Sequence, residues 1–469
     1  MLKKLKEGHW PIFILSSFSS FMNLFLPIIL VRILAPSEIG LYKIFFIHLM
    51  VFPFLFLIGG PVQSVYYWVG KKEEERAGYL HSTWALTAIL SLLVLIVSLP
   101  FINFISSWLD FPTKYSFLMI FSGSLLVLSG HYGEAKTALG DRITGTSFNT
   151  GFEVIKVLSI LITAWITKDV GSIFFAYTIV FLSKLIISSI LGYKAKTLSF
   201  NFDKEKIKEV FWYCFPISLS ALLGFFVDKI DLLILSSYLD SEGFAFYSMG
   251  CLVVPPLILL DMSVQKVLIP KLSTLYNEKK FEVASEHFRK AISDTSFLII
   301  PAIFGLIFFA EPIVTLLYTD KYQSSAIFLK IFAIGYLQYT IPHDAIPRAS
   351  GNSGWILKIY LVTTPISLVA VFLAAKYSGA EAALTAAIIL KFFPKFFGIL
   401  YSKKLMNWGW KDVFPYSRIL LYSMVALALS LISLFVKSFF TTELIWFFVC
   451  APIFAAVYLG TLYKLRSKL

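Results

Sequence analysis

The sequence is short of charged residues, of cysteine and of the motifs that build catalytic sites. Only 15% of its 469 residues are charged, whereas soluble domains have about 25%. Its three cysteines, Cys214, Cys251 and Cys450, each lie in an apolar run and are expected to be small buried side chains. The six histidines lack metal-ligand spacing, and no Walker A, Gly-x-Ser-x-Gly or dinucleotide-binding sequence occurs. These absences argue against a soluble domain, a disulfide scaffold, an ATPase, a metal site and an organic cofactor.

Long apolar runs fill most of the chain. Apolar residues make up 58% of the sequence and the mean hydropathy is +0.79, while a helix that crosses a bilayer needs about 20 apolar residues. The first run is too long for a signal peptide and is expected to remain as a span. We therefore predict an all-α polytopic membrane protein with fourteen transmembrane helices. They are expected at residues 10–34, 39–60, 79–99, 115–138, 146–166, 171–193, 211–238, 243–265, 291–318, 325–346, 355–375, 380–401, 416–436 and 443–463.

The net charge of +13 is unevenly distributed along these predicted spans. With the N-terminus inside, the inner segments hold 27 lysines and arginines, the outer loops five, and the spans nine. Because cytoplasmic loops are enriched in Lys and Arg, both termini are predicted to be cytoplasmic, in a multi-pass protein of the cytoplasmic (inner) membrane. The basic charge then does not indicate a nucleic-acid partner. Every outer loop is too short to hold a catalytic domain.

The two halves of the chain are similar in sequence. A shift of 205 residues places 11–42 on 216–247 with seven identities, among them Tyr42 with Tyr247. Six spans separate the copies, so the halves have the same orientation, as in transporters built from parallel repeats. We predict two six-helix bundles with a cavity between them, followed by two additional helices. The predicted domains are 1–200, 201–408 and 409–469.

Four stretches resemble a known family of membrane proteins. They are residues 30–42 (LVRILAPSEIGLY), 59–64 (GGPVQS), 267–276 (VLIPKLSTLY) and 309–318 (FAEPIVTLLY). Each has Gly or Pro where a helix must end or bend. Together they resemble the polysaccharide-unit flippases of the multidrug/oligosaccharidyl-lipid/polysaccharide exporter superfamily, over most of residues 1–405. The second repeat departs from the family pattern at Ala245, where a glycine is expected before Phe246.

This resemblance implies a transporter rather than an enzyme. The expected function is to move an oligosaccharide carried on undecaprenyl pyrophosphate, such as an O-antigen, exopolysaccharide or capsule repeat unit, from the inner to the outer leaflet by alternating access. The implied partners are the lipid-linked glycan, membrane lipids, H⁺ or Na⁺ as a coupling ion, and polysaccharide polymerase or assembly proteins. No cofactor is implied.

Basic residues inside the predicted spans are the candidates for contact with the substrate. A charge at mid-bilayer costs about 2.5–3.5 kcal/mol on insertion scales, so such residues should face protein or water. Lys391 and Lys395 share a helix face four residues apart, where like charges repel, and an anionic pyrophosphate would stabilise both. In the alternative interpretation each lysine pairs with a carboxylate or reaches an interface. The candidates are Arg32, Lys156, Lys184, Lys229, Lys330, Lys391 and Lys395.

Acidic residues in the spans are candidates for coupling transport to an ion gradient. Asp228 and Asp231 share a helix face, and two close carboxylates suit a bound proton or Na⁺. The alternative is a structural network with Lys229 or with a lysine of a neighbouring span. Glu153, a third candidate, lies three residues before Lys156 and is expected to form an internal ion pair with it.

Three other functions are compatible with parts of the sequence. A lipid II flippase shares the fourteen spans and the basic cavity, although the four stretches favour a polysaccharide-unit flippase. An ion-coupled multidrug exporter takes cationic substrates and should have an acidic cavity, against which the deep lysines argue. A polysaccharide polymerase or ligase usually has its catalytic residues in a large outer loop, which is lacking in the predicted topology. A local salt bridge is expected between Asp344 and Arg348.

Overall fold

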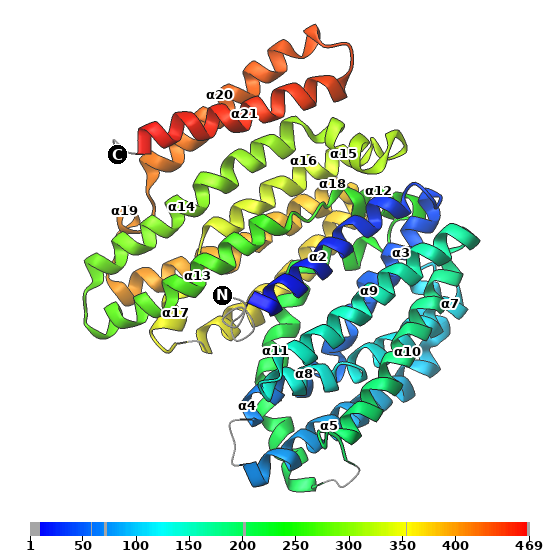
Figure 1. Cartoon of the computed structure of the whole chain (residues 1–469). Coiled ribbons are helices and arrows are strands. Elements are labelled where there is room, and N and C mark those ends of the chain that lie inside the picture. The colour runs from blue at the N-terminus through cyan, green and yellow to red at the C-terminus, as the bar shows by residue number, and fades with distance from the viewer. Residues whose placement is uncertain (1–9, 58, 70–72, 200–202, 353, 467–469) are drawn as a thin grey trace. The chain divides into compact units, whose positions relative to one another are not determined.

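The computed structural model describes residues 10–57, 59–69, 73–199, 203–352 and 354–466. The regular structure of this part of the chain is helical, without strands, which confirms the all-α prediction (Figure 1). The N-terminal lysines that contribute to the predicted inner charge lie outside the described residues. The elements are α2 (Trp10–Leu30), α3 (Pro36–Leu49), η1 (Phe52–Leu57), α4 (Gly59–Trp68), α5 (Glu73–Ser98), η2 (Leu99–Phe101), α6 (Ile102–Trp108), α7 (Thr113–Leu128), α8 (His131–Ala138), α9 (Arg142–Thr167), α10 (Val170–Lys194), α11 (Lys204–Leu235), α12 (Ser241–Gly250), α13 (Pro255–Asn277), α14 (Phe281–Phe308), α15 (Ala310–Tyr318), η3 (Asp320–Tyr322), α16 (Ser325–Ile334), η4 (Gly335–Thr340), α17 (Ala345–Ala349), α18 (Gly354–Met406), α19 (Trp410–Val413), α20 (Tyr416–Val436), η5 (Lys437–Phe439) and α21 (Glu443–Arg466).

Many of these helices are long and apolar enough to cross a membrane. Ten such ranges occur among the described residues, or eleven when α12 and α13, which are bent by 51°, are counted as one span. Helix α18 is 53 residues long and breaks at Gly379, so it contains two of the predicted spans. Each of the fourteen predicted ranges contains helix, but the range 325–346 consists of α16 followed by the 3₁₀ helix η4.

The chain folds into two compact units. The N-terminal unit comprises Met1–Leu222 and Leu239–Ala245, and the C-terminal unit comprises Leu223–Tyr238 and Phe246–Leu469. Helix α11 contributes to both units. The domain limits expected from the sequence, at residues 200 and 408, stay predictions.

The turns that follow α2 and α11 have matching backbone hydrogen bonds 205 residues apart. The amide of Arg32 donates to the carbonyl of Ile29 at 3.1 Å, and the amide of Ser237 donates to the carbonyl of Ile234 at 3.1 Å. Each turn leads into a helix that soon breaks, because α3 is followed by η1 and α4, and α12 by the bent α13. The offset is the one found in the sequence, which supports the internal repeat.

Aromatic contacts join the helices of the N-terminal unit. Phe45 of α3 stacks on Phe174 of α10 with ring centroids 3.9 Å apart. Near the other end of the unit, Trp68 of α4 stacks on Tyr79 of α5 at 4.5 Å. Trp68 is almost fully buried, and such aromatic pairs contribute about 0.5–1.5 kcal/mol beyond their burial. These stacks hold α3, α5 and α10 around the interior of the unit.

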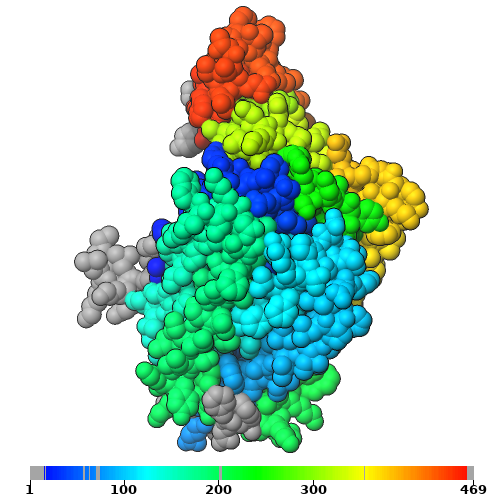
Figure 2. Space-filling view, turned by 90° about the vertical axis from the view of Figure 1, so that its right-hand side faces the viewer, coloured from blue at the N-terminus to red at the C-terminus, as the bar shows by residue number. Residues whose placement is uncertain are grey.

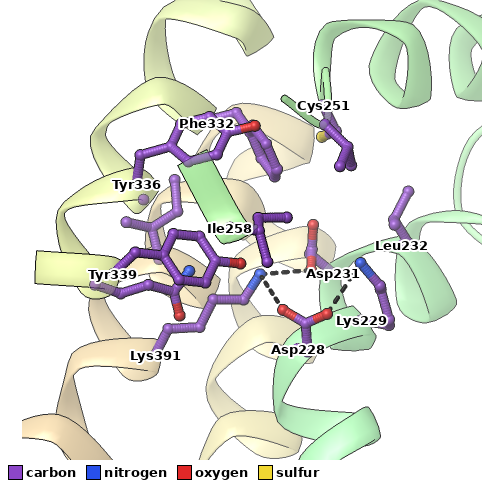
Figure 3. A pocket seen from close by; sticks show the side chains of 14 residues that line it. Asp228, Lys229, Asp231, Leu232, Cys251, Ile258, Phe332, Tyr336, Tyr339 and Lys391 are labelled. Atoms are coloured by element: carbon purple, nitrogen blue, oxygen red, sulfur yellow. Dashed lines mark ion pairs between the residues drawn. The ribbon is translucent and has the colours of Figure 1, made fainter. Parts of the chain in front are cut away.

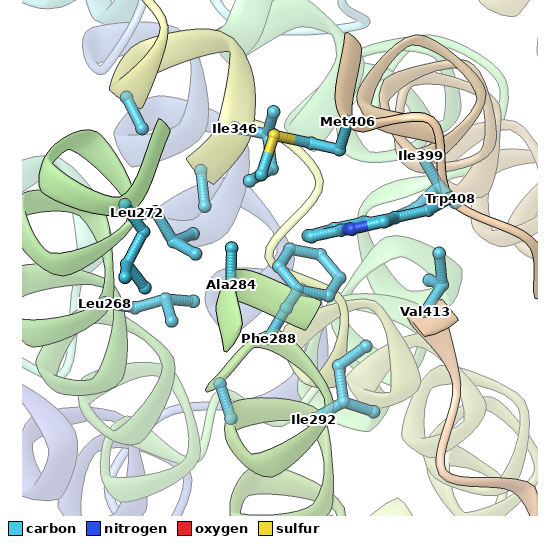
Figure 4. Close-up of a cluster of buried hydrophobic side chains, with 14 residues drawn as sticks. Leu268, Leu272, Ala284, Phe288, Ile292, Ile346, Ile399, Met406, Trp408 and Val413 are labelled. Carbon is cyan, nitrogen blue, oxygen red and sulfur yellow. The ribbon is translucent and has the colours of Figure 1, made fainter. Parts of the chain in front are cut away.

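The C-terminal unit has a buried apolar core at the junction of α13, α14, α17 and the end of α18 (Figure 4). Leu272, Phe288 and Ile346 are almost fully buried there. The indole of Trp408 packs against Phe288 and donates a hydrogen bond of 2.9 Å to the carbonyl of Phe281. This core fixes the end of α18 against α14. A second cluster attaches α20 and α21 to α14 through Ile300, Tyr422, Ala426, Phe454 and Tyr458.

Large apolar side chains cover the surface of both units. Trp165 of α9 is 73% exposed and Phe435 of α20 is 78% exposed. Helices α9 and α10 lie on the surface of the N-terminal unit, in teal and green in Figure 2. Soluble monomers rarely expose contiguous apolar area on this scale. Together with the long apolar helices, these exposed side chains indicate a surface that faces lipid.

Candidate functional site

The charged residues predicted from the sequence are divided between the two units. Glu153, Lys156 and Lys184 gather in the N-terminal unit. In the C-terminal unit, Lys391 and two aspartates line one cavity. Each unit therefore has its own group of deep charged side chains.

In the N-terminal unit, Lys156 of α9 forms an ion pair with Glu153 on the preceding turn, which confirms the predicted pair. Asn23 of α2 joins it: its amide nitrogen donates to Glu153 at 3.3 Å, and its amide oxygen accepts from Lys156 at 3.0 Å. Asn23 was not among the predicted residues. The signal that could have revealed it is a lone amide within an apolar span.

Lys184 of α10 lies near this ion pair but does not take part in it. The residue is only 6% exposed, and its ammonium lies 6.0 Å from the ring centre of Phe152 and 5.7 Å from that of Phe181. Within the described part of the chain it makes no hydrogen bond and no ion pair. Aromatic rings stabilise a buried cation only partly, so Lys184 keeps its capacity to bind an anion.

Arg32 and Lys330, two of the predicted basic residues, do not join the group of Lys156 and Lys184 or the network around Lys391. Arg32, in the turn after α2, is exposed and its guanidinium donates to the carbonyl of Ile28. Lys330 of α16 pairs with Glu311 of α15 at 2.7 Å, and Glu311 also lies 3.7 Å from Lys437. The Lys330 ammonium is thus already neutralised by a carboxylate.

The C-terminal unit contains a cavity of about 230 Å³ that is lined by charged side chains together with apolar ones. Figure 3 shows Lys391 of α18 pointing into it toward Asp228 and Asp231 of α11. The Lys391 ammonium lies 3.8 Å from Asp228 Oδ1 and 3.8 Å from Asp231 Oδ1. Lys229 approaches Asp228 from the other side at 2.9 Å. Two aspartates and one lysine of α11 thus form a network of four charges with Lys391 of α18.

The two carboxylates of this network have different surroundings. The side chain of Asp228 is 47% exposed and that of Asp231 only 2%. Tyr247 of α12 donates a hydrogen bond of 2.5 Å to Asp231 Oδ2, whereas Asp231 Oδ1 accepts no hydrogen bond in the described residues. Tyr247 was not predicted as a site residue, although the 205-residue repeat had already aligned it with Tyr42.

Lys391 is buried without a direct hydrogen bond. It is 7% exposed, and both carboxylate oxygens lie beyond the usual limit of about 3.2 Å for an N–H···O bond. Among the described residues it donates no hydrogen bond, so its N–H groups are available to a ligand in the cavity. Gly379 starts the helical segment that carries Lys391, because its φ of 82° ends the preceding segment.

Lys395 follows Lys391 by one helical turn and is half-buried. It lies within electrostatic range of Asp261 and Asp344. Asp344 pairs with Arg348 at 2.6 Å, which confirms the predicted local salt bridge. The two lysines of the predicted pair therefore have different main carboxylate neighbours. These are Asp228 and Asp231 for Lys391, and Asp261 and Asp344 for Lys395.

Neither cluster has the composition of a metal site. Over the described residues, no group of three or more His, Cys, Asp or Glu side chains is arranged to hold a metal ion. The arrangement that is present, buried ammonium groups with unused donors beside carboxylates, can bind and exchange anions.

The fold is similar to that of a solved flippase. The structure described as the lipid II flippase MurJ in an inward closed conformation matches with a TM-score of 0.74 and 18% identity, over 98% of this chain and 99% of that chain. This similarity establishes the fold, a polytopic all-α membrane architecture.

Curated relatives and a family model agree with that fold. An uncharacterized membrane protein in the cps region of Klebsiella pneumoniae is 25% identical over 333 residues, 68% of this chain and 65% of that protein. The capsular polysaccharide biosynthesis protein CapF of Staphylococcus aureus is 27% identical over 194 residues, 41% of this chain and 49% of that protein. The match thus spans about two thirds and one half of these relatives. The model of the polysaccharide biosynthesis protein family matches residues 29–327. The chain therefore belongs to the polysaccharide biosynthesis protein family, in agreement with the family resemblance of its sequence.

Proposed function

We propose that this protein is a flippase that moves an undecaprenyl-pyrophosphate-linked oligosaccharide across the cytoplasmic membrane by alternating access. The observation that carries the proposal is Lys391, a buried ammonium with unused donors in the cavity that it shares with two aspartates. Because the chain belongs to a polysaccharide biosynthesis family, we infer that the anion bound at Lys391 is the diphosphate of a lipid-linked glycan. A diphosphate offers several oxygens to an ammonium, and hydrogen bonds between charged groups are roughly twice as strong as neutral ones.

The N-terminal unit supplies a second site of the same chemistry. Lys184 is buried against Phe152 and Phe181 and forms no ion pair with a carboxylate of the described residues, so a phosphate oxygen would replace the solvation that this ammonium has lost. Lys156 stands beside it, already neutralised by Glu153. In the C-terminal unit we assign Lys391 to direct contact with the diphosphate, with Lys229 and Lys395 as further candidates. In the N-terminal unit Lys184 is the candidate for phosphate contact, with Lys156 beside it.

A capsule repeat unit is the glycan that the relatives favour. The Staphylococcus aureus relative is named for capsular polysaccharide biosynthesis, and the Klebsiella pneumoniae relative lies in a cps region. The second candidate is lipid II, favoured by the fold match that covers nearly the whole of both chains. Both substrates are lipid-linked glycans with a diphosphate, so the basic residues serve either. An ion-coupled multidrug exporter fits less well because cationic substrates are repelled by Lys184 and Lys391.

The remaining proposals concern the setting of the flippase. Both termini are placed in the cytoplasm by the excess of basic residues in the predicted inner loops. Asp228, Asp231 and Glu153 are the candidates for coupling to H⁺ or Na⁺. A polysaccharide polymerase or assembly protein is the expected partner that receives the glycan, and the flippase itself performs no catalytic step.

Substitution of the two lysines on α18 tests this function. Lys391→Gln with Lys395→Gln removes both charges from one face, and we expect transport of undecaprenyl-diphosphate-linked glycan between the leaflets of proteoliposomes to fall at least about tenfold, the effect of about 1.4 kcal/mol. Lys358→Gln, an exposed lysine on the same helix, is the matched control and should transport normally. Equal transport by the double variant and the control, with equal insertion, would remove these lysines from the substrate site.

A further inference from the structure

The cavity of the C-terminal unit has a balanced set of charges. Asp228 and Asp231 carry two negative charges and Lys229 and Lys391 carry two positive ones, all connected by ion pairs of 2.9–3.8 Å (Figure 3). The Lys391 ammonium is equidistant from one oxygen of each aspartate and hydrogen-bonded to neither. It is therefore held by charge, without the directional bonds that would fix it in place.

We propose that Asp228 and Asp231 are internal substitutes for the substrate's diphosphate, which hold Lys391 until phosphate oxygens take it, and that Asp231 then takes up a proton. This inference rests on the proposed function, because it assumes that a diphosphate reaches Lys391. It identifies the aspartates as competitors of the substrate rather than as its ligands.

The first step is the exchange of partners at Lys391. A diphosphate carries more negative charge than one carboxylate and can donate several oxygens to the three N–H groups of the ammonium. Because Lys391 has no hydrogen bond to lose, the exchange costs only the two longer ion pairs. Asp228 keeps a cation after the exchange, since Lys229 remains 2.9 Å away.

The second step is protonation of Asp231, which follows from the contacts that its carboxylate retains after Lys391 has moved to the diphosphate. Without Lys391 its carboxylate keeps the hydrogen bond from Tyr247 at Oδ2, and Oδ1 has no hydrogen-bond donor in the described residues. Lys229 lies within electrostatic range of Asp231 but forms its ion pair with Asp228. A buried carboxylate that has lost its ion-pair partner is disfavoured. A proton from cavity water therefore binds Oδ1, and the hydroxide left behind is neutralised by the solution. The titratable and charged groups that line the cavity or adjoin Asp231 are Asp228, Lys229, Tyr247, Cys251, Tyr336, Tyr339, Lys391 and Lys395.

The same geometry favours H⁺ over Na⁺ at this place. A sodium ion bound between the two carboxylates would need the position that the Lys391 ammonium already holds, 3.8 Å from both. Even after Lys391 has turned to the diphosphate, a sodium ion between the carboxylates would be repelled by Lys229, which stays 2.9 Å from Asp228, and by Lys391 across the cavity. A proton on Oδ1 needs no such space.

Calorimetric titration of the purified full chain with inorganic diphosphate tests the proposal. Binding heats measured in two buffers of different ionisation enthalpy give the number of protons taken up, and the contribution of the ligand itself is the same for every variant. We expect wild type to take up about one proton more per diphosphate than Asp231→Asn. We also expect Asp231→Asn to bind about tenfold more tightly, within the usual range of coupling between sites.

Asp228→Asn is the matched control, since Asp228 has the same distance to Lys391 but is half-exposed. It should tighten binding and leave proton uptake at the wild-type value. Equal uptake by wild type and Asp231→Asn, or unchanged affinity of Asp231→Asn, overturns the competition. Because Asp231→Asn could fail to fold, infrared difference spectra of wild type supply a second measurement. Diphosphate should produce a protonated-carboxyl band, and its absence also overturns the proposal.

Failure of the underlying function has a different signature. If wild type does not bind diphosphate, or if Lys391→Met binds it equally well, Lys391 is not an anion site and the proposed function loses the residue that carries it. If Lys391→Met abolishes binding while Asp231→Asn behaves as wild type, the anion site stands and the competition is wrong.

Discussion

A buried lysine without a carboxylate partner is costly for the fold. Lys184 is 6% exposed, its ammonium lies 6.0 Å and 5.7 Å from the ring centres of Phe152 and Phe181, and it forms no ion pair within the described residues. Burying a charge destabilises a protein unless the charge is paired and hydrogen-bonded. Residues that lower stability in this way are characteristic of functional sites. Lys184 therefore differs from Lys156, whose charge is neutralised by Glu153 and whose ammonium also donates a hydrogen bond to Asn23.

Replacing each of these two lysines with Met separates function from stability. Lys184→Met removes an unpaired charge, so we expect the protein to become more stable by roughly 0.5–2 kcal/mol while glycan transport falls. Lys156→Met leaves Glu153 without its cation and should lower stability. Thermal unfolding in detergent and transport in proteoliposomes measure the two effects. A Lys184→Met protein that is less stable than wild type would give this lysine a structural role.

Spacing along a helix decides which ion pairs the sequence can predict. Glu153 with Lys156 and Asp344 with Arg348 lie three and four residues apart, and both pairs form as expected. Asp231 and Lys391 are brought together only by the packing of α11 against α18, so their pairing could not be predicted from local pattern. The sequence offered the alternative that Asp231 meets a lysine of a neighbouring span, without indicating which lysine.

At the scale of elements, apolar run length predicted where helix forms but only some of the places where it breaks. All fourteen predicted ranges contain helix, since a long apolar segment in lipid must satisfy its backbone hydrogen bonds internally. The break at Gly379 falls between the predicted spans 355–375 and 380–401, so the limits of these two spans did predict it. The change from α16 to the 3₁₀ helix η4 was not predicted. It lies beside the cavity, which Tyr336 and Tyr339 of η4 line.

Two aspartates cap long helices outside the spans, and pH should reveal their contribution. Asp169 accepts hydrogen bonds of 2.7 Å from the backbone and the hydroxyl of Ser172 at the start of α10. These bonds lower the pKa of Asp169 below its usual range. A lowered pKa means that the stabilisation is present above the unfolded-state value, near about 3.9, and is lost as the pH falls through the lower folded-state value.

Asp169→Ala should therefore destabilise the protein by about 1 kcal/mol at neutral pH, and the difference from wild type should shrink at acidic pH. Asp141→Ala is the comparison at the start of α9. Its hydrogen bond to the Thr144 amide is longer, 3.4 Å, so its effect should be smaller. Thermal unfolding midpoints at neutral pH and below pH 4 measure both. A difference between wild type and Asp169→Ala that does not change with pH would show that the carboxylate charge is not what caps α10.

At the scale of the whole molecule, the repeat is visible in both sequence and structure. Turns with equivalent hydrogen bonds lie 205 residues apart, and each precedes a helix that breaks. The deep charges do not follow this repeat. The N-terminal unit keeps Lys184 unpaired, whereas the C-terminal unit surrounds Lys391 with two aspartates. The two halves thus repeat the same turn and helix break, but their buried charged residues differ.

The distribution of basic residues predicts the orientation of the whole chain, and thiol labelling can test it. The native cysteines Cys214, Cys251 and Cys450 are 3–8% exposed, so they should react slowly. A membrane-impermeant maleimide added to intact cells, or to spheroplasts where an outer membrane blocks access, should label Lys376→Cys, in a predicted outer loop. Lys279→Cys, in a predicted inner loop, should be labelled only after lysis. Eleven predicted spans separate Lys376 from the N-terminus and eight separate Lys279 from it, so reversed labelling would invert the predicted side of every loop. Because 27 basic residues lie on the predicted inner side and five on the outer, we expect the positive-inside orientation.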